Sequence, residues 1–435
     1  MFLFAVSIFL SAFLLFQIEP MIGKFILPWF GGTPAVWSTV MLFFQVLLTG
    51  GYAYAYWLIR RIKGKRQPII HIALITLATL LFILLSFIWT SPITPGPGWK
   101  PQNVRSPVLD IFKLLIVSVG LPYFILASNS PLMQAWFSRL FPKESYARLY
   151  ALSNAGSLLG LLTYPVLIEP ILSLRLQGWM WSVSFVLFGF LAGWTAVAAQ
   201  SGHTAPLAQP MQPKVESASS ADRPSFALRS LWIALSATAS LFLLSVTNQI
   251  TQEVAVIPFL WVLPLALYLL SFILTFSGER GYHRRFYAIF FILAAALTLF
   301  IMLNATAVHV YWQILAYCLL LFAACMLCHG ELYLLRPASE HLTAFYLMVS
   351  IGGALGGIFV SLIAPLIFNG YWEFFVGLAM TIAILLTILR ENTNASMNKA
   401  KALQARSRFV FTVFGLVTVM LTVLSIYFSG ALYSK

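Results

Sequence analysis

The residues of this chain with the clearest capacity for chemistry are carboxylates inside long apolar segments. Glu19 and Glu169 each directly precede a proline, and Glu253 stands a few residues before one. Proline removes a backbone hydrogen-bond donor and leaves carbonyl oxygens that can bind a cation. Ionisable groups are costly in hydrocarbon and usually face a bundle interior or a water-filled cavity. We therefore treat these three carboxylates as candidate substrate-binding groups.

Neutral polar, aromatic and further ionisable residues extend this set. The additional candidates are Gln17, Trp37, Gln45, Asn129, Asn154, Asn248, His329 and Glu331. Carboxylates beside aromatic rings suit a small organic cation, through ion pairing and cation–π attraction. A proton can share the same carboxylates, because burial favours the neutral form of a glutamate. The alternative is that the acids lie at a membrane interface, where they meet water and headgroups. We expect Glu373 at such an interface.

One short segment matches a cofactor pattern. Cys325-Met-Leu-Cys328-His329 fits the C-x-x-C-H arrangement that attaches a c-type haem. It falls inside an apolar helical segment, however, where the two cysteines share one face and pack as small apolar side chains. Only His329 and Glu331 follow as further ligands, which is too few to define a metal set. We therefore expect no haem, metal or other cofactor here.

Composition places these groups in a membrane. Of the 435 residues, 60% are hydrophobic and 9% are charged, whereas a soluble domain carries roughly 25% charged residues. A membrane-spanning helix needs roughly 20 apolar residues. The segments that fit are 2–29, 35–59, 69–90, 108–137, 148–171, 178–199, 230–252, 256–277, 286–304, 310–331, 342–368, 371–389 and 409–430. We predict an all-α integral membrane protein that crosses the bilayer many times.

The basic residues define an orientation. Lys and Arg gather in alternate loops, beginning with Arg60 to Arg66 and ending with Arg390 to Arg408, while the intervening loops carry few. By the positive-inside rule the basic loops are cytoplasmic, which places the N-terminus inside and the C-terminus outside. The net charge of +14 is thereby explained by topology, and we expect no nucleic-acid partner.

A repeated glycine pattern and a polar linker divide the chain. Residues 1–199 form one predicted six-helix half, 200–229 a cytoplasmic linker, 230–390 a second half, and 391–435 a basic loop with an extra span. The fifth span of each half carries small residues four apart, which lets helices pack closely. These are Gly156 and Gly160, matched by Gly352, Gly353, Gly356 and Gly357. Two parallel six-helix halves are the layout of major-facilitator transporters.

Several stretches carry a family resemblance that covers nearly the whole chain. They are 13–37, 130–137, 261–272, 328–332, 341–347 and 352–357. On these stretches the chain resembles the membrane region of the fused major-facilitator/spermidine-synthase proteins of bacteria. The resemblance implies a facilitator-like bundle in the bacterial cytoplasmic (inner) membrane. The soluble aminopropyltransferase-like domain of that family would begin roughly where this sequence stops, so we do not expect synthase activity.

Two functions remain open at this point. The first is a facilitator-like transporter or permease for polyamines or other organic cations. The second is a non-transporting membrane subunit that anchors or gates a separate spermidine-synthase-like partner. The sequence contains no Walker loop, G-x-G-x-x-G loop or G-x-S-x-G elbow, and no acid–base–nucleophile set that would indicate a membrane enzyme.

Overall fold

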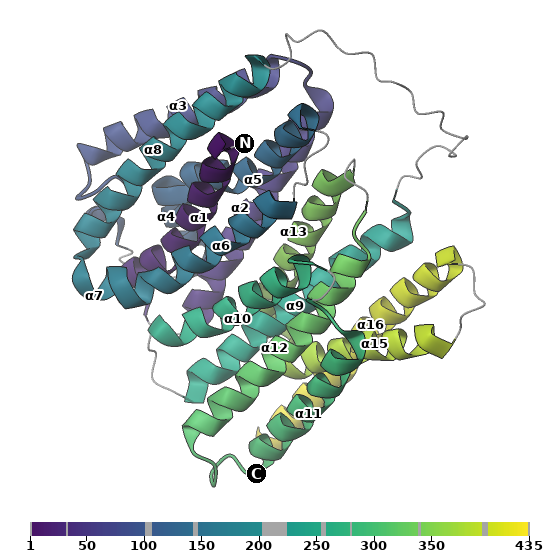
Figure 1. Ribbon diagram of the computed structural model, residues 1–435. Helices are drawn as coiled ribbons and strands as arrows, with labels where there is room; N and C mark the ends of the chain where they lie inside the picture. Colours follow the sequence, from purple (N-terminus) through teal and green to yellow (C-terminus); the bar gives the residue numbers. More distant parts are fainter. Residues whose placement is uncertain are drawn as a thin grey trace, which may run out of the picture.

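The computed structural model describes residues 2–31, 34–100, 107–141, 147–201, 224–253, 258–278, 281–337, 341–393 and 399–433. Within these ranges the chain is a bundle of long helices (Figure 1). Helices are the expected outcome, because a bilayer offers no partner for backbone amides and carbonyls, and an α-helix satisfies them internally. The prediction of an all-α multi-pass membrane protein is confirmed.

The helices fall into two groups along the chain. The first group is α1 (Phe2–Phe30), α2 (Pro34–Arg61), α3 (Arg66–Ser86), α4 (Pro107–Leu115), α5 (Leu121–Leu140), α6 (Ala147–Thr163), α7 (Glu169–Ile171) and α8 (Leu174–Ser201). The second group is α9 (Phe226–Glu253), α10 (Pro258–Phe276), α11 (Arg284–Leu303), α12 (Val310–Leu334), α13 (Leu342–Ile358), α14 (Ala364–Ile367), α15 (Glu373–Thr393) and α16 (Lys399–Tyr433).

Each predicted span coincides with one of these helices or helical runs. Among the described residues, 11 helices are long and apolar enough to cross a membrane. The predicted span at 256–277 contains the shorter apolar helix Leu260–Phe276. The predicted span at 148–171 corresponds to α6, a π-helical turn and α7, which follow one another without a loop. The N-terminal end of α1 and the C-terminal end of α16 lie at opposite ends of the bundle (Figure 1).

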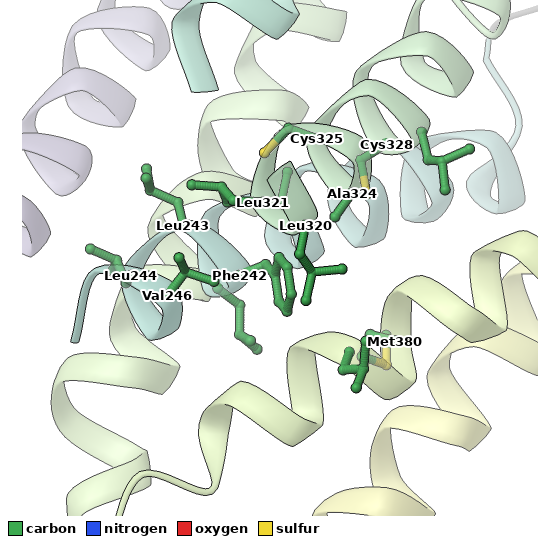
Figure 2. Close-up of a cluster of buried hydrophobic side chains, with 14 of the residues drawn as sticks. Phe242, Leu243, Leu244, Val246, Leu320, Leu321, Ala324, Cys325, Cys328 and Met380 are labelled. Atoms are coloured by element: carbon green, nitrogen blue, oxygen red, sulfur yellow. The ribbon is translucent and has the colours of Figure 1, made fainter. Parts of the chain in front are cut away.

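Buried apolar side chains form two clusters. One is built from residues between Phe4 and Ala199, on α1 to α8. The other is built mainly from residues between Trp232 and Leu421, and Trp37, Met41 and Leu161 join it from the first group of helices. Figure 2 shows part of the second cluster, where side chains of α9, α12 and α15 meet. Each helix group therefore has its own core, and the cores touch through α2 and α6.

Two glycines bring α6 against α1. A methyl group added to Gly156 would lie 2.6 Å from the backbone oxygen of Phe9, and one added to Gly160 would overlap that of Phe13. Any larger side chain would force the helices apart, because the obstacle is backbone and cannot rotate away. This glycine pair thus sets the separation of α1 and α6.

The same arrangement recurs between α13 and α9. A methyl group on Gly356 would lie 2.6 Å from the backbone oxygen of Ala237, and one on Gly352 would overlap that of Ile233. Gly357 faces another helix, since a methyl group there would collide with the Gln45 side chain of α2. Gly353 has more room, with the Ser236 hydroxyl 3.9 Å from an added methyl group.

A π-helical turn interrupts each of these two glycine-bearing runs. The turns are η3 (Tyr164–Ile168), between α6 and α7, and η6 (Phe359–Ile363), between α13 and α14. Each closes with an amide that bonds to a carbonyl five residues back, from Glu169 to Tyr164 and from Ala364 to Phe359. A proline follows each closing residue, and its missing N–H removes the next α-helical bond.

The last helix, α16, packs on the second group. Ser407 of α16 exchanges a 2.8 Å hydrogen bond with Ser230 of α9. Further along, the Ser425 hydroxyl accepts a 2.8 Å bond from the amide of Asn369. Hydrogen bonds therefore fasten the extra span to α9 and to the connection between α14 and α15.

Candidate binding cavity

A cavity of about 190 Å³ lies where the two helix groups meet. Its walls come from α1, α2, α5 and α6 of the first group and from α9, α10 and α13 of the second. The polar side chains on these walls are Ser11, Glu19, Gln45, Tyr52, Tyr123, Ser130, Gln134, Ser153, Asn154, Ser157, Ser236, Ser240, Tyr268, Tyr346 and Ser350. Apolar side chains, including Phe16, Phe44 and Phe272, make up the remaining surface.

Glu19 is the only carboxylate among the described residues that line this cavity, and no Lys, Arg or His lines it. The side chain is 4% exposed. Its Oε1 accepts a 2.9 Å hydrogen bond from the Tyr123 hydroxyl, and its Oε2 has no hydrogen-bond partner. An ionised carboxylate without a counter-charge is very costly in such surroundings. Glu19 is therefore a group that needs a proton or a bound cation.

Gln45 and Asn154 add neutral polar groups to the same walls. The Gln45 amide nitrogen donates a 2.9 Å bond to the Ser240 hydroxyl, which in turn donates a 2.9 Å bond to the carbonyl of Gly353. This chain of bonds ties α2 to α9 and α13. The Gln45 amide oxygen is buried and has no partner. Asn154 lines the cavity from α6.

Asn129 and Gln17 are buried and do not line the cavity. The Asn129 amide donates a 2.9 Å bond to the hydroxyl of Ser11 and a 3.2 Å bond to the carbonyl of Ser7, which holds α5 against α1. Ser11 itself lines the cavity. Gln17 lies on the buried part of α1. The structure thus gives Asn129 a contact with one wall residue.

Glu169 is paired and lies apart from the cavity walls. Its carboxylate forms an ion pair with Lys24 of α1, and both side chains are partly exposed. The two acid–proline pairs of the first helix group therefore differ in setting, since Glu19 lacks a basic partner among the described residues and Glu169 has one. The side chain of Glu253 lies outside the described residues.

Trp37 and Asn248 join the two helix groups. The ring of Trp37 on α2 stacks on that of Trp261 on α10, with centroids 4.4 Å apart. Nearby, the Ser38 hydroxyl donates a 3.0 Å bond to the Asn248 side chain of α9. Asn248 also donates a 3.3 Å bond to Glu373. Glu373 is buried and is the first residue of α15, and its place at the membrane interface stays a prediction.

Glu331 lies in a separate ion-pair cluster near the C-terminal end of α12. Arg284 of α11 contacts both of its oxygens at 2.7 and 2.8 Å, and Arg406 of α16 contacts Oε2 at 2.8 Å. The hydroxyl of Tyr282 also donates a 3.2 Å hydrogen bond to Oε1 of Glu331. The carboxylate is fully saturated by these partners and ties three helices together.

His329 is fully buried beside the aromatic wall of the cavity. Its Nδ1 lies 2.9 Å from the Ser271 hydroxyl, and its ring packs edge-on against Tyr268 with centroids 4.7 Å apart. Tyr268 lines the cavity, so His329 stands one side chain behind the wall. Cys325 and Cys328 are free thiols in the apolar core of α12 (Figure 2).

Sequence reasoning missed Tyr123 and Tyr268, which line the same cavity as Glu19. Tyr123 and Tyr268 stand in apolar segments, and neither is close to Glu19 in sequence. A hydroxyl inside an otherwise apolar run was the available signal, because a buried tyrosine hydroxyl usually needs a partner. Which carboxylate it meets depends on helix packing.

No protein-family model matches the sequence, and a comparison with curated proteins gives no match.

Proposed function

We propose that this protein is a facilitator-like transporter that binds an organic cation at Glu19. The observation that carries the proposal is a buried carboxylate, with one oxygen unpartnered, on the wall of a cavity shared by the two helix groups. Buried ionisable groups inside membrane proteins usually mark substrate or ion pathways. The tyrosine and phenylalanine rings beside Glu19 supply faces for cation–π contact.

Repeated packing supports the two-half architecture of this proposal. Helix α6 approaches α1 through glycines four residues apart, and α13 approaches α9 in the same way. The π-helical turns η3 and η6 stand at equivalent places in the two glycine-bearing runs, and each is followed by proline. Parallel repeats of this kind are a property of major-facilitator proteins. The resemblance to the fused major-facilitator/spermidine-synthase membrane region points in the same direction.

The contacts between the two groups favour a cavity reached from one side. Trp37 and Trp261 stack at the ends of α2 and α10 that lie away from the basic loops. The cavity extends towards the other end, where Gln134 and Tyr346 line it. With the basic loops in the cytoplasm, the stacked tryptophans close the outer side, and the substrate enters from within.

Uptake of labelled amines by proteoliposomes containing the full chain tests this function. We expect flux of at least one organic cation, and loss of that flux in Glu19→Gln, where the amide oxygen can still accept the Tyr123 bond. Glu169→Gln is the matched control, because it is the same chemical change outside the cavity walls. Absence of flux for every amine refutes the proposal, and co-purification of a soluble synthase-like protein would then favour a membrane subunit.

A further inference from the structure

We infer that the cavity accepts amphiphilic amines with a single positive charge, and that each amine is exchanged for one proton at Glu19. This inference rests on the transport function proposed above and specifies its substrate class and coupling. It excludes polyamines, which the family resemblance suggests, as preferred substrates.

The charge inventory limits the substrate to one positive charge. Glu19 is the only carboxylate among the described residues that line the cavity. Of the other described acids that are buried or half-buried, Glu169 pairs with Lys24, Glu331 pairs with two arginines, and Glu373 accepts a bond from Asn248. None of these three lines the cavity. Spermidine would bring further ammonium groups into a cavity without carboxylates to meet them. Buried charges without a partner are strongly disfavoured.

The apolar part of the lining favours a substrate that carries a hydrophobic group beside its single positive charge. Tyr123 holds the carboxylate of Glu19 at the wall formed by α1 and α5. Phe44 of α2 and Phe272 of α10 contribute apolar ring surface to the same cavity. A hydrophobic substituent on the amine would cover these rings, whereas an extended polyamine offers mainly short methylene links between charges. Apolar surface that leaves water contributes favourably in proportion to its area.

The groups that face Glu19 leave its charge to be balanced by the ligand. From α5 it meets Tyr123, and the cavity walls on α2, α10 and α13 contribute Tyr52, Tyr268 and Tyr346. Helix α6 contributes neutral Asn154 and serines, and α9 contributes serines. Tyrosines carry no charge near neutral pH.

The negative charge of the Glu19 carboxylate is therefore neutralised by one proton or by one ammonium ion. When the amine binds, the carboxyl proton leaves, and when the amine departs, a proton returns. One positive charge travels in each direction, so a complete exchange moves no net charge across the membrane. A proton gradient drives such an exchange, and a membrane potential does not.

Proteoliposome uptake of two cations, one with a single permanent charge and one with several charges, tests both the single-charge assignment and the proton exchange. Phenyltrimethylammonium carries one permanent charge and cannot cross as a free base, and spermidine carries three charges near neutral pH. We expect an acidic interior to drive phenyltrimethylammonium uptake, and spermidine uptake to be at least about 10-fold slower. A potential imposed with potassium and valinomycin should leave the rate unchanged. Glu19→Gln should abolish the proton-driven component, while Glu169→Gln should retain it.

The outcomes separate the inference from the function beneath it. Spermidine uptake as fast as that of phenyltrimethylammonium would overturn the single-charge assignment. A rate that follows the membrane potential would overturn the one-for-one exchange. Absence of uptake of both cations, with no quenching of tryptophan fluorescence by either in detergent, would instead refute the transport function.

Discussion

The ion-pair cluster around Glu331 allows a sharp test of what holds α11, α12 and α16 together. The perturbation is Glu331→Gln, which keeps the size of the side chain and removes its charge. Its carboxylate is 0% exposed, and it contacts Arg284 and Arg406 at 2.7 to 2.8 Å. After the change, two guanidinium groups face an amide whose NH₂ group cannot accept a hydrogen bond.

The expected loss follows from the burial of this cluster. Removing one partner of a buried ion pair costs about 3 to 5 kcal/mol, because the remaining charge is left without compensation. Arg284 is 29% exposed and water can reach it in part, which favours the lower end of that range. Burial and the neighbouring carboxylate raise the pKa of Tyr282 above its usual range, so its hydroxyl stays protonated and continues to donate.

Asp110→Asn is the matched control. Asp110 pairs with Lys113 three residues along the same helix, at 3.8 Å, and the two side chains are 31% and 73% exposed. Exposed pairs of this kind contribute about 0 to 1 kcal/mol. Both variants exchange a carboxylate for an amide, so they differ mainly in burial.

The assay is reversible unfolding in mixed micelles, followed by circular dichroism as the fraction of denaturing detergent rises. We expect a clear decrease in the free energy of unfolding for Glu331→Gln and little change in it for Asp110→Asn. Adding Arg406→Met to Glu331→Gln should recover part of the lost stability, since it removes one of the two guanidinium groups that Glu331 contacts. Equal stability of the two single variants would refute the reasoning that burial makes this cluster a structural tie.

Two further predictions concern the helix contacts. Gly356→Ala should destabilise the bundle by about 1 to 3 kcal/mol in the same unfolding assay, because the added methyl group meets the backbone of Ala237. Gly415→Ala, at a helical glycine with nothing within 4 Å of the added methyl group, should be neutral or stabilising, and equal losses at both sites would contradict the close-packing argument. Trp37→Ala should open the end of the cavity closed by the Trp261 stack, measured as faster labelling of a Ser38→Cys thiol by a membrane-impermeant maleimide. An unchanged labelling rate would show that the stack does not close that end.

The positions of the helices could be predicted from the sequence, because they follow from local composition. A run of about 20 apolar residues has one stable conformation in a bilayer, whatever its neighbours are. The glycine spacing was readable for a similar reason, since residues four apart share one helix face. Which helix each glycine would approach was not readable. Gly156 and Gly352 could have met any neighbour until the packing placed Phe9 and Ile233 against them.

The site was predicted only in part, because its partners are far apart in the sequence. Glu19 was selected from its depth in an apolar segment, but Tyr123, its hydrogen-bond donor, lies 104 residues away. Glu169 was selected by the same rule, yet Lys24 lies beside it in the folded chain. Glu331 likewise met Arg284 and Arg406, 47 and 75 residues distant. Sequence shows that an acid is buried and does not show which charges surround it.

The sequence by itself determined that this is a multi-pass helical membrane protein, because hydropathy over one helix length is a local property. The tertiary structure alone decided which carboxylate stands on the wall of a cavity without a basic partner. Electrostatic compensation depends on distances of a few ångströms between helices, and only the packed bundle fixes those distances. Glu19, Glu169 and Glu331 are alike in the sequence as acids within apolar segments, and their neighbours give them three different settings.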